Sequence, residues 1–350
     1  MPFFTEPNAP DPSNRLPPGS RPDYGGVVWP VGGNEAMAGP RFDVAVGPGG
    51  YAWWYCDALS DDGNFGLTII AFIGSVFSPY YAWSGRRDPI DHSAINVALY
   101  GRDRKRHWTK GRWAMTERRK TAVEVGERDL QIGRSALSWD GSELVIEINE
   151  TTTPVPLPIK GKVRVIPDGI TKQIFALDAD GHHRWWPIAP TARVEVDLET
   201  PAVTWGGHGY LDSNDGEIPL EHSFETWDWA RASLSEGAAV LYDVIRADGE
   251  RLSLALRFKP DGEIEAFEPP QRTKLPKTLW GIARNTQADD GRAKVVKTME
   301  DTPFYARSEL ETHVLGERAP AIHESLSLSR FKSDWVKLLL PFRMPRDMHG

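Results

Sequence analysis

The segment Gly50-Tyr-Ala-Trp-Trp-Tyr-Cys-Asp57 is followed by the turn residues Ser60-Asp-Asp-Gly63 and then by the apolar run Gly66-Leu-Thr-Ile-Ile-Ala-Phe-Ile-Gly-Ser-Val-Phe77. Aromatic and β-branched residues on both sides of an Asp-Gly pair are typical of a β-hairpin. The neighbouring carboxylates Asp61 and Asp62 could act as an acid and a base, but Asp-Asp-Gly is also a common turn sequence. We therefore interpret this segment as an antiparallel hairpin whose acidic residues form the turn.

The same turn chemistry recurs along the chain, which contains eight Asp-Gly pairs. In residues 135–148 and 250–267, apolar and polar residues alternate with the period of two that is typical of a half-buried strand. Weak helical patterns occur near residues 89–98 and 323–336. The sequence therefore predicts an all-β, antiparallel protein with few short helices.

The length of 350 residues is enough for two domains. Residues 1–40 are rich in proline and glycine without periodicity, which indicates an extended arm. The segment Thr151-Thr-Thr-Pro-Val-Pro-Leu-Pro158 would interrupt pairing between strands, so we expect a boundary there. We predict an N-terminal β-domain at residues 41–158 and a C-terminal β-domain at residues 159–350, two antiparallel barrels or sandwiches packed together.

Charge and cysteine content limit the functional classes. The formal net charge of −8 argues against a general nucleic-acid binder. A single cysteine, Cys56, excludes an intrachain disulfide and a cysteine-based zinc site. The N-terminus lacks a signal-peptide pattern, and the apolar run at residues 66–77 is shorter than the roughly 20 residues of a membrane helix. We expect a cytoplasmic protein.

Residues 101–113 are basic with interleaved tryptophans, and such a segment could contact phosphate, nucleic acid or anionic lipid. Apart from Arg118-Arg119-Lys120, no basic stretch extends this footprint. In an acidic chain we therefore favour an exposed hairpin, or contact with a membrane surface, over nucleic-acid binding.

Four histidines in the second half, His182, His183, His208 and His222, suggest a metal site, because imidazole is the commonest transition-metal ligand. Their spacing matches no standard zinc motif. We favour histidines that orient a catalytic group over metal ligands.

Side chains of interest share strand faces in two segments. In Trp205-Gly-Gly-His208-Gly-Tyr210-Leu-Asp212, residues two apart lie on one face, so Tyr210 and Asp212 point the same way. Residues 214–216, Asn-Asp-Gly, predict a turn. By the same period, His183 and Trp185 share a face of their own strand.

An inward orientation of these faces would place the Asp212 carboxyl group among aromatic side chains. Loss of solvent raises the pKa of such a group and keeps it protonated. The fourteen tryptophans of the chain fit either an aromatic ligand cavity or a thick β-core. Ordinary hairpins with buried Trp and Tyr explain the periodicity equally well, so the residues alone leave both interpretations open.

Several long strings are specific enough to indicate a family. They are residues 49–63, 67–81 and 91–101, Gly206-Gly-His-Gly-Tyr-Leu-Asp-Ser-Asn214, and Leu340-Pro-Phe-Arg-Met-Pro-Arg346. The chain closely resembles, from about residue 24 to residue 346, the carotenoid 1,2-hydratases (hydroxyneurosporene synthases) of photosynthetic bacteria. The resemblance implies lipocalin-like β-domains, a fold that the superfamily shares with cofactor-free polyene cyclases.

The resemblance also implies a reaction: addition of water, without cofactor or metal, to the terminal C1=C2 double bond of an acyclic carotenoid such as neurosporene or lycopene. The implied catalytic residues are Asp212, His183, Tyr210 and Trp185. Asp212 would protonate C2, Trp185 and Tyr210 would stabilise the cation at C1, and His183 or the Asp212 carboxylate would accept a proton from water.

Residues expected to line the substrate site are Trp186, Trp205, His208 and Trp227. The substrate resides in a bilayer, so we expect peripheral association with the inner, photosynthetic membrane, with residues 102–112 as one headgroup contact. Three other classes remain alternatives: a non-catalytic carrier of an apolar polyene, a cofactor-free polyene cyclase and a carbohydrate-active β-protein.

Overall fold

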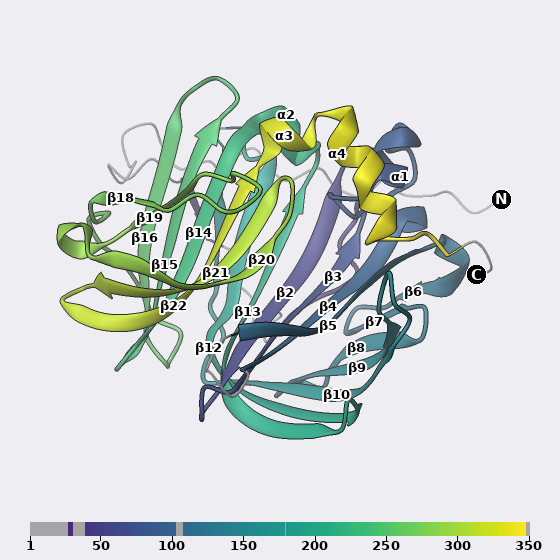
Figure 1. Ribbon diagram of the computed structural model, residues 1–350, viewed down its shortest axis with the longest axis horizontal. Helices are drawn as coiled ribbons and strands as arrows, with labels where there is room; N and C mark the ends of the chain where they lie inside the picture. The colour runs from purple at the N-terminus through teal and green to yellow at the C-terminus, as the bar shows by residue number, and fades with distance from the viewer. Residues whose placement is uncertain (1–26, 31–38, 103–107, 179, 348–350) are drawn as a thin grey trace.

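The computed structural model describes residues 27–30, 39–102, 108–178 and 180–347, and its described part is built from two large antiparallel sheets packed against each other (Figure 1). The first sheet, sheet A, has the strand order β5-β4-β3-β2-β13-β12-β10-β9-β8-β7-β6, with β11 joining β1 to β12. Its strands are β1 (Val27–Pro30), β2 (Tyr51–Ser60), β3 (Phe65–Ile73), β4 (Ser93–Arg102), β5 (Trp108–Arg118), β6 (Val123–Val125), β7 (Asp129–Ile132), β8 (Ser135–Trp139), β9 (Leu144–Thr151), β10 (Pro158–Pro167), β11 (Gln173–Ala176), β12 (His183–Thr200) and β13 (Val203–Gly216).

The second sheet, sheet B, has the order β17-β16-β15-β14-β22-β21-β20. Its strands are β14 (Phe224–Leu234), β15 (Gly237–Arg246), β16 (Arg251–Phe258), β17 (Ile264–Ala266), β20 (Ala293–Asp301), β21 (Tyr305–Val314) and β22 (Glu317–Ser327), and a separate hairpin comprises β18 (Arg272–Leu275) and β19 (Arg284–Gln287). The prediction of an all-β, antiparallel fold is confirmed.

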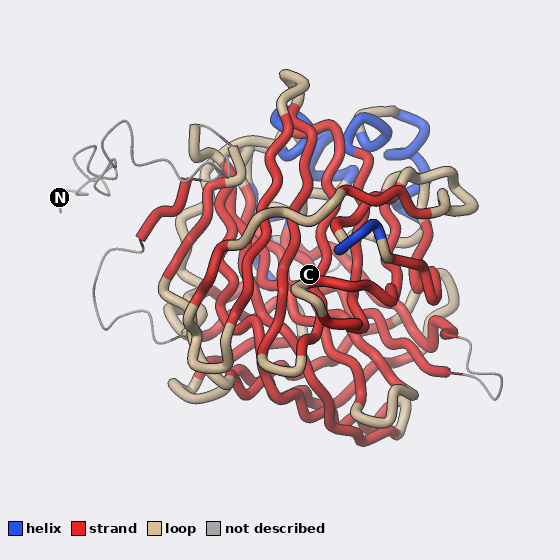
Figure 2. The backbone as a smooth tube through the Cα atoms, turned by 90° about the vertical axis from the view of Figure 1, so that its left-hand side faces the viewer, coloured by secondary structure: helices blue, strands red, loops and turns tan. Residues whose placement is uncertain are grey.

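Short helices gather mainly at one edge of the two sheets (Figures 1 and 2). They are α1 (Pro79–Trp83), α2 (Leu220–Ser223), α3 (Leu328–Phe331) and α4 (Asp334–Leu339), with the 3-10 helices η2 (Pro89–His92), η3 (Lys120–Ala122), η4 (Asp289–Gly291) and η5 (Leu340–Phe342). The helical prediction for residues 89–98 was largely wrong, because β4 begins at Ser93 and is buried on both faces. The prediction for residues 323–336 was wrong up to Ser327, the end of β22.

The hairpins predicted at residues 50–77, 135–148 and 250–267 are present as β2–β3, β8–β9 and β16–β17. Strand pairing continues across residue 158, where β9 pairs with β10, and the break between the two sheets falls after Gly216. Division into folding domains stays a prediction. Of the predicted arm, residues 1–26 and 31–38 lie outside the described residues.

Strand β2 supplies side chains to two separate cores. Trp54 and Cys56 face the core enclosed by the curved, barrel-like sheet A. Tyr51 and Tyr55, one residue out of phase, face the second core between sheet A and sheet B. Because successive side chains of a strand point to opposite faces, a strand buried on both sides is apolar throughout. Burial on both sides accounts for the continuous apolar run of β3. The face of sheet A that carries Tyr51 and Tyr55 packs against sheet B.

Candidate active site

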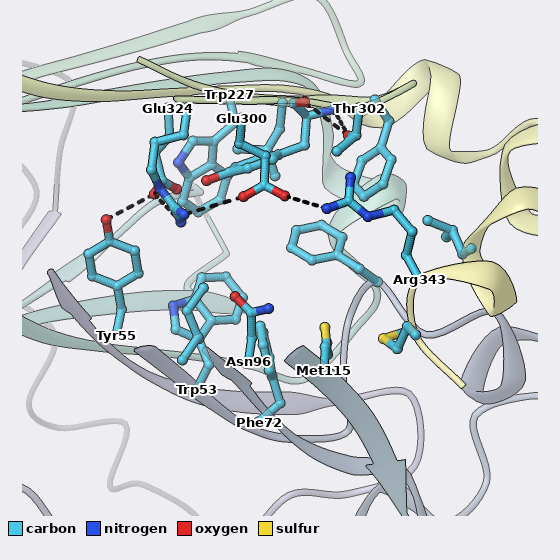
Figure 3. Close-up of a pocket in the computed structure, with 18 of the residues that line it drawn as sticks. Trp53, Tyr55, Phe72, Asn96, Met115, Trp227, Glu300, Thr302, Glu324 and Arg343 are labelled. Carbon is cyan, nitrogen blue, oxygen red and sulfur yellow. Dashed lines mark hydrogen bonds and ion pairs between the residues drawn. The ribbon is translucent and has the colours of Figure 1, made fainter. Parts of the chain in front are cut away.

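A cavity of about 420 Å³ lies between the two sheets (Figure 3). In Figure 3, Trp53, Phe72 and Met115 point into it from sheet A, and Trp227 from sheet B. A largely apolar, aromatic cavity of this size is typical of small-molecule sites, which usually carry a few placed polar groups. Asp212 is one of the polar residues that line it.

The Asp212 carboxyl group is almost completely buried. Its Oδ2 accepts a hydrogen bond of 2.7 Å from the Tyr210 hydroxyl and one of 2.9 Å from the Trp185 indole N–H. Its Oδ1 is buried and has no hydrogen-bond partner in the described part of the chain. Because Oδ2 accepts two hydrogen bonds, a proton on this group is best placed on Oδ1.

Burial raises the pKa of Asp212 to about 8, because the charged form loses its solvation. The hydrogen bonds from Tyr210 and Trp185 act in the opposite direction, and the carboxylates of Glu324 and Asp57 add a further increase. Asp57 itself forms a buried ion pair with Arg231. At neutral pH, Asp212 is therefore a neutral carboxylic acid in an aromatic cavity.

Strand pairing accounts for the position of this acid. β13 lies between β2 and β12, in a register that places Trp185 opposite Asn214. A Cβ atom on Gly207 would lie 2.0 Å from the carbonyl oxygen of Leu59, and one on Gly209 would lie 2.7 Å from that of Asp57. The glycines of the Gly-Gly-His-Gly segment thus permit the close approach of β13 to β2.

His183 shares the inward face with Trp185 but contacts other residues. Its Nδ1 lies 2.9 Å from the Tyr51 hydroxyl and its Nε2 lies 2.8 Å from the Ser223 hydroxyl. Burial lowers the pKa of His183 to about 3, so the ring is neutral. The imidazole therefore links β2, β12 and α2, and both of its nitrogens are already engaged.

The four side chains expected to line the substrate site lie in different places. Trp227 lines the cavity. Trp186 packs in the core inside sheet A and donates its N–H to the carbonyl oxygen of Thr171, at 3.1 Å. Trp205 packs against the same core, and the His208 side chain is 80 % exposed. The structure thus brings Asp212, Tyr210 and Trp185 together, and it places Trp186, Trp205 and His208 away from them.

Sequence reasoning missed several residues of the cavity. Trp229 on β14 and Tyr242 on β15 line it from sheet B, and Asn214 lines it from β13. The prediction of a turn at residues 214–216 was wrong, since β13 continues to Gly216. Asn214 lies two residues after Asp212, so the strand period of two places its side chain on the same face and could have identified it as a cavity residue. No comparable local signal identifies Trp229 and Tyr242, because the packing of distant strands brings them here.

Two of these residues carry buried donors that make no hydrogen bond of good geometry in the described part of the chain, Asn214 Nδ2 and Trp229 Nε1; the Asn214 side chain also interacts with the Tyr242 hydroxyl. Both side chains line the same cavity as Asp212. Unsatisfied buried polar groups are costly and usually indicate a water or ligand position. The cavity therefore combines an acid with donors that lack a hydrogen bond of good geometry.

A series of linked ion pairs lines the cavity on the side of sheet B (Figure 3). Glu324 Oε1 accepts hydrogen bonds of 2.9 Å each from the Tyr55 hydroxyl and Arg307 Nε. Arg307 also lies 3.5 Å from Glu300, which pairs in turn with Arg343 at 3.4 Å. The negative charges of Glu324 and Glu300 are paired with guanidinium groups, whereas the Asp212 carboxyl group accepts hydrogen bonds only from neutral donors.

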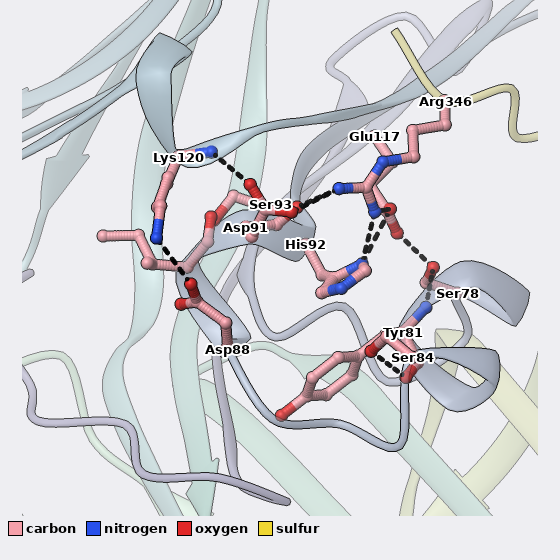
Figure 4. Close-up of polar contacts among 11 residues, drawn as sticks. Ser78, Tyr81, Ser84, Asp88, Asp91, His92, Ser93, Glu117, Lys120 and Arg346 are labelled. Carbon is pink, nitrogen blue, oxygen red and sulfur yellow. Dashed lines mark hydrogen bonds and ion pairs between the residues drawn. The ribbon is translucent and has the colours of Figure 1, made fainter. Parts of the chain in front are cut away.

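The C-terminal segment borders one end of the cavity. Leu340, Arg343 and Met344 line it, and Arg346 anchors the segment through Glu117 and Asp91 (Figure 4). Glu117, fully buried, also accepts hydrogen bonds from the Ser78 hydroxyl and pairs with His92. Through these contacts of Arg346, the network holds the segment Leu340–Arg346 in place beside the cavity.

In the described residues, no group of three or more His, Cys, Asp or Glu side chains is arranged to hold a metal ion. His182 lies near Glu217 at the surface, and His208 lies near Asp61. None of the helices in the described part of the chain has the length and apolarity to cross a membrane.

These features define a lipocalin-like β-protein with an enclosed carboxylic acid. A model of the family "Carotenoid hydratase CrtC" matches residues 69–349. The chain belongs to this carotenoid hydratase family.

Relatives named acyclic carotenoid 1,2-hydratase support the assignment. The protein from Thiocapsa roseopersicina is 56% identical over 333 residues, covering 94% of this chain and 81% of the relative. That from Rubrivivax gelatinosus is 49% identical over 315 residues, covering 88% and 76%. Among solved structures, a putative AttH from Nitrosomonas europaea has a TM-score of 0.53 at 13% identity, covering 79% of this chain and 92% of that one. This last similarity concerns the fold alone.

Proposed function

We propose that this protein adds water across the terminal C1=C2 double bond of an acyclic carotenoid, such as neurosporene or lycopene, without a cofactor. The observation that carries the proposal is a carboxylic acid held neutral by burial, with its Oδ1 free beside an aromatic cavity. The names of the relatives supply the reaction class.

Protonation of the alkene is the first step. An isolated alkene is a very weak base, so the acid must be protonated and close to C2. Asp212 transfers its proton from Oδ1 to C2. The Tyr210 hydroxyl and the Trp185 N–H then stabilise the resulting carboxylate through Oδ2. These two side chains lie behind the acid, fully buried, rather than over the substrate.

The positive charge appears at C1, a tertiary carbon that offers no hydrogen-bonding group. Aromatic faces attract such a cation, by about 1–2 kcal/mol each in a desolvated site. Trp227, Trp229 and Tyr242 line the cavity and take this role. The charge of the new Asp212 carboxylate also lies close to the cation.

Water capture completes the addition. A water molecule held by Asn214 Nδ2 or Trp229 Nε1 attacks C1, because both side chains line the cavity together with Asp212 and both donors lack a hydrogen bond of good geometry in the described part of the chain. The Asp212 carboxylate accepts the proton that this water loses, which regenerates the acid and balances the reaction. With both ring nitrogens engaged, His183 acts as a positioning residue through Tyr51 and Ser223.

Peripheral contact with the membrane follows from the substrate, which is insoluble in water. That the basic segment 102–112 contacts the membrane stays a prediction, because residues 103–107 lie outside the described residues. Arg102, at the start of this segment, pairs with Glu309 at 3.0 Å. The mouth of the cavity offers a better-defined surface, described below.

Incubation with lycopene and ¹⁸O-labelled water tests the proposal. We expect labelled 1-hydroxylycopene from the wild-type protein and a loss of at least about 100-fold in Asp212→Asn, with pigment binding retained. Asp215→Asn is the matched control, since Asp215 lies on the same strand and pairs with Arg184. Bound but unchanged pigment with the wild-type protein would indicate a carrier, and full activity of Asp212→Asn would remove Asp212 as the acid.

A further inference from the structure

An apolar surface borders the mouth of the cavity. We call it the apolar rim; its residues are Leu279, Trp280, Trp335, Leu338, Leu339 and Phe342. Their exposed fractions run from 40% for Leu339 to 103% for Leu279. Single exposed apolar side chains are common, but a contiguous group of this kind usually marks an interaction site.

The fold itself does not require these side chains to be apolar. The residue of α4 that is buried is Val336, which packs with Phe304 and Phe331. Trp335 instead stacks on Trp280 at the surface, with ring centroids 6.5 Å apart, and Leu338 is 62% exposed. Polar residues at these two positions would leave the buried contacts of α4 intact.

The apolar rim is continuous with the cavity. Trp280, Leu339 and Phe342 are exposed to solvent and also line the cavity. A ligand that crosses the rim would therefore contact apolar side chains from the surface to the interior.

The segment that carries four of the six rim residues has a net charge opposite to that of the whole chain. Between residues 327 and 343 there are four basic residues, Arg330, Lys332, Lys337 and Arg343, against one acidic residue, Asp334. The chain as a whole has a formal charge of −8. Apolar and aromatic side chains next to Lys and Arg are the combination that binds the interface of an anionic membrane.

The route into the cavity supports contact with a bilayer. An acyclic carotenoid is a long hydrocarbon that is insoluble in water, and the proposed reaction takes place at one of its ends. Because Trp280, Leu339 and Phe342 form an apolar path from the surface to the interior, one end of such a molecule can enter from an apolar medium at the mouth.

From these observations we infer that the apolar rim inserts into the surface of an anionic lipid bilayer, so that one end of the polyene enters the cavity while the rest stays in the hydrocarbon. The polyene part of this inference rests on the proposed function. The lipid contact is independent of it and is measured separately.

Flotation with vesicles tests the contact, with phosphatidylcholine alone or mixed with phosphatidylglycerol. We expect the wild-type protein to bind the mixed vesicles, and Leu338→Glu to bind at least about tenfold more weakly. Lys332→Glu/Lys337→Glu should lose the preference for phosphatidylglycerol. Leu315→Glu is the matched control, because Leu315 is 38% exposed in the turn between β21 and β22 and should leave binding unchanged.

Activity separates this inference from the proposed function. Leu338→Glu should hydrate lycopene in vesicles at least about tenfold more slowly and lycopene in detergent micelles at the wild-type rate, since Leu338 makes no part of the cavity lining described above. Equal vesicle binding by wild type and Leu338→Glu would overturn the docking surface, as would a rim that instead joins two copies of the chain in sedimentation measurements. Absence of hydration in both media would refute the proposed function and leave vesicle binding as the test of the rim.

Discussion

Replacement of Tyr210 by Phe tests how the protein sets the acidity of Asp212. The Tyr210 hydroxyl donates a 2.7 Å hydrogen bond to Oδ2, which stabilises the carboxylate and lowers the pKa. A hydrogen bond to a charged group contributes about 1.5–3 kcal/mol, or roughly one to two pKa units. Tyr210→Phe should therefore raise the pKa of Asp212 by about that amount and make it a weaker acid.

The pH dependence of kcat/KM reports this change. For the wild-type protein we expect a plateau below pH 8 and a decline above it, because burial raises the pKa of Asp212 to about 8 and the acid must be protonated. In Tyr210→Phe the decline should move upward by about one to two pH units while the plateau falls about 10- to 100-fold. Tyr51→Phe, which removes a hydroxyl from His183 instead, is the control. A decline that stayed in place or moved to lower pH in Tyr210→Phe would refute this account of the acid.

Two further predictions concern water capture and stability. Asn214→Leu should slow hydration at least about tenfold, while deuterium from heavy water still enters recovered lycopene, because protonation precedes capture; loss of both together would argue against a role in holding water. The folded state keeps the Asp212 proton up to about pH 8, whereas the unfolded chain releases it near pH 3.9, so this group makes stability fall as pH rises between those values. Asp212→Asn should thus raise the melting temperature relative to the wild type more at pH 8 than at pH 5, and a difference that is independent of pH would contradict the raised pKa.

The sequence predicted the hairpins and the proximity of Tyr210 to Asp212, because both depend on local turn chemistry and on the strand period. The pairing of β12 with β13 brings Trp185 to the same carboxyl group. The period of two does not identify the side of β12 that faces the ligand, since residues 185–190 of this strand are buried on both sides. Trp185 therefore reaches the acid, whereas Trp186, one residue later, packs inside sheet A.

Other parts of the site depend on contacts between distant segments. Trp229 and Tyr242 reach the cavity because sheet B packs on sheet A, and no local pattern records that packing. The sequence Asn-Asp-Gly predicts a turn at Asn214, but pairing of β13 with both β2 and β12 extends the strand through it. Tertiary pairing thus outweighed the local preference at a position that now carries a proposed function.

The raised pKa of Asp212 and the binding of an apolar substrate both require that bulk water stay out of the cavity. The covering of the cavity mouth therefore matters for the acid inside it. Water at the Asp212 end would restore the solvation of the carboxylate and lower its pKa towards the ordinary value, so that the acid would be ionised at neutral pH. A mouth pressed into a bilayer admits hydrocarbon in place of bulk water. Water is also a reactant, and the donors of Asn214 and Trp229 that lack a hydrogen bond of good geometry offer positions for a single bound molecule beside Asp212. Burial within the protein sets the raised pKa of Asp212, and docking at the rim keeps bulk water out while the substrate enters, so the decline in kcat/KM should begin at a lower pH in detergent than in vesicles.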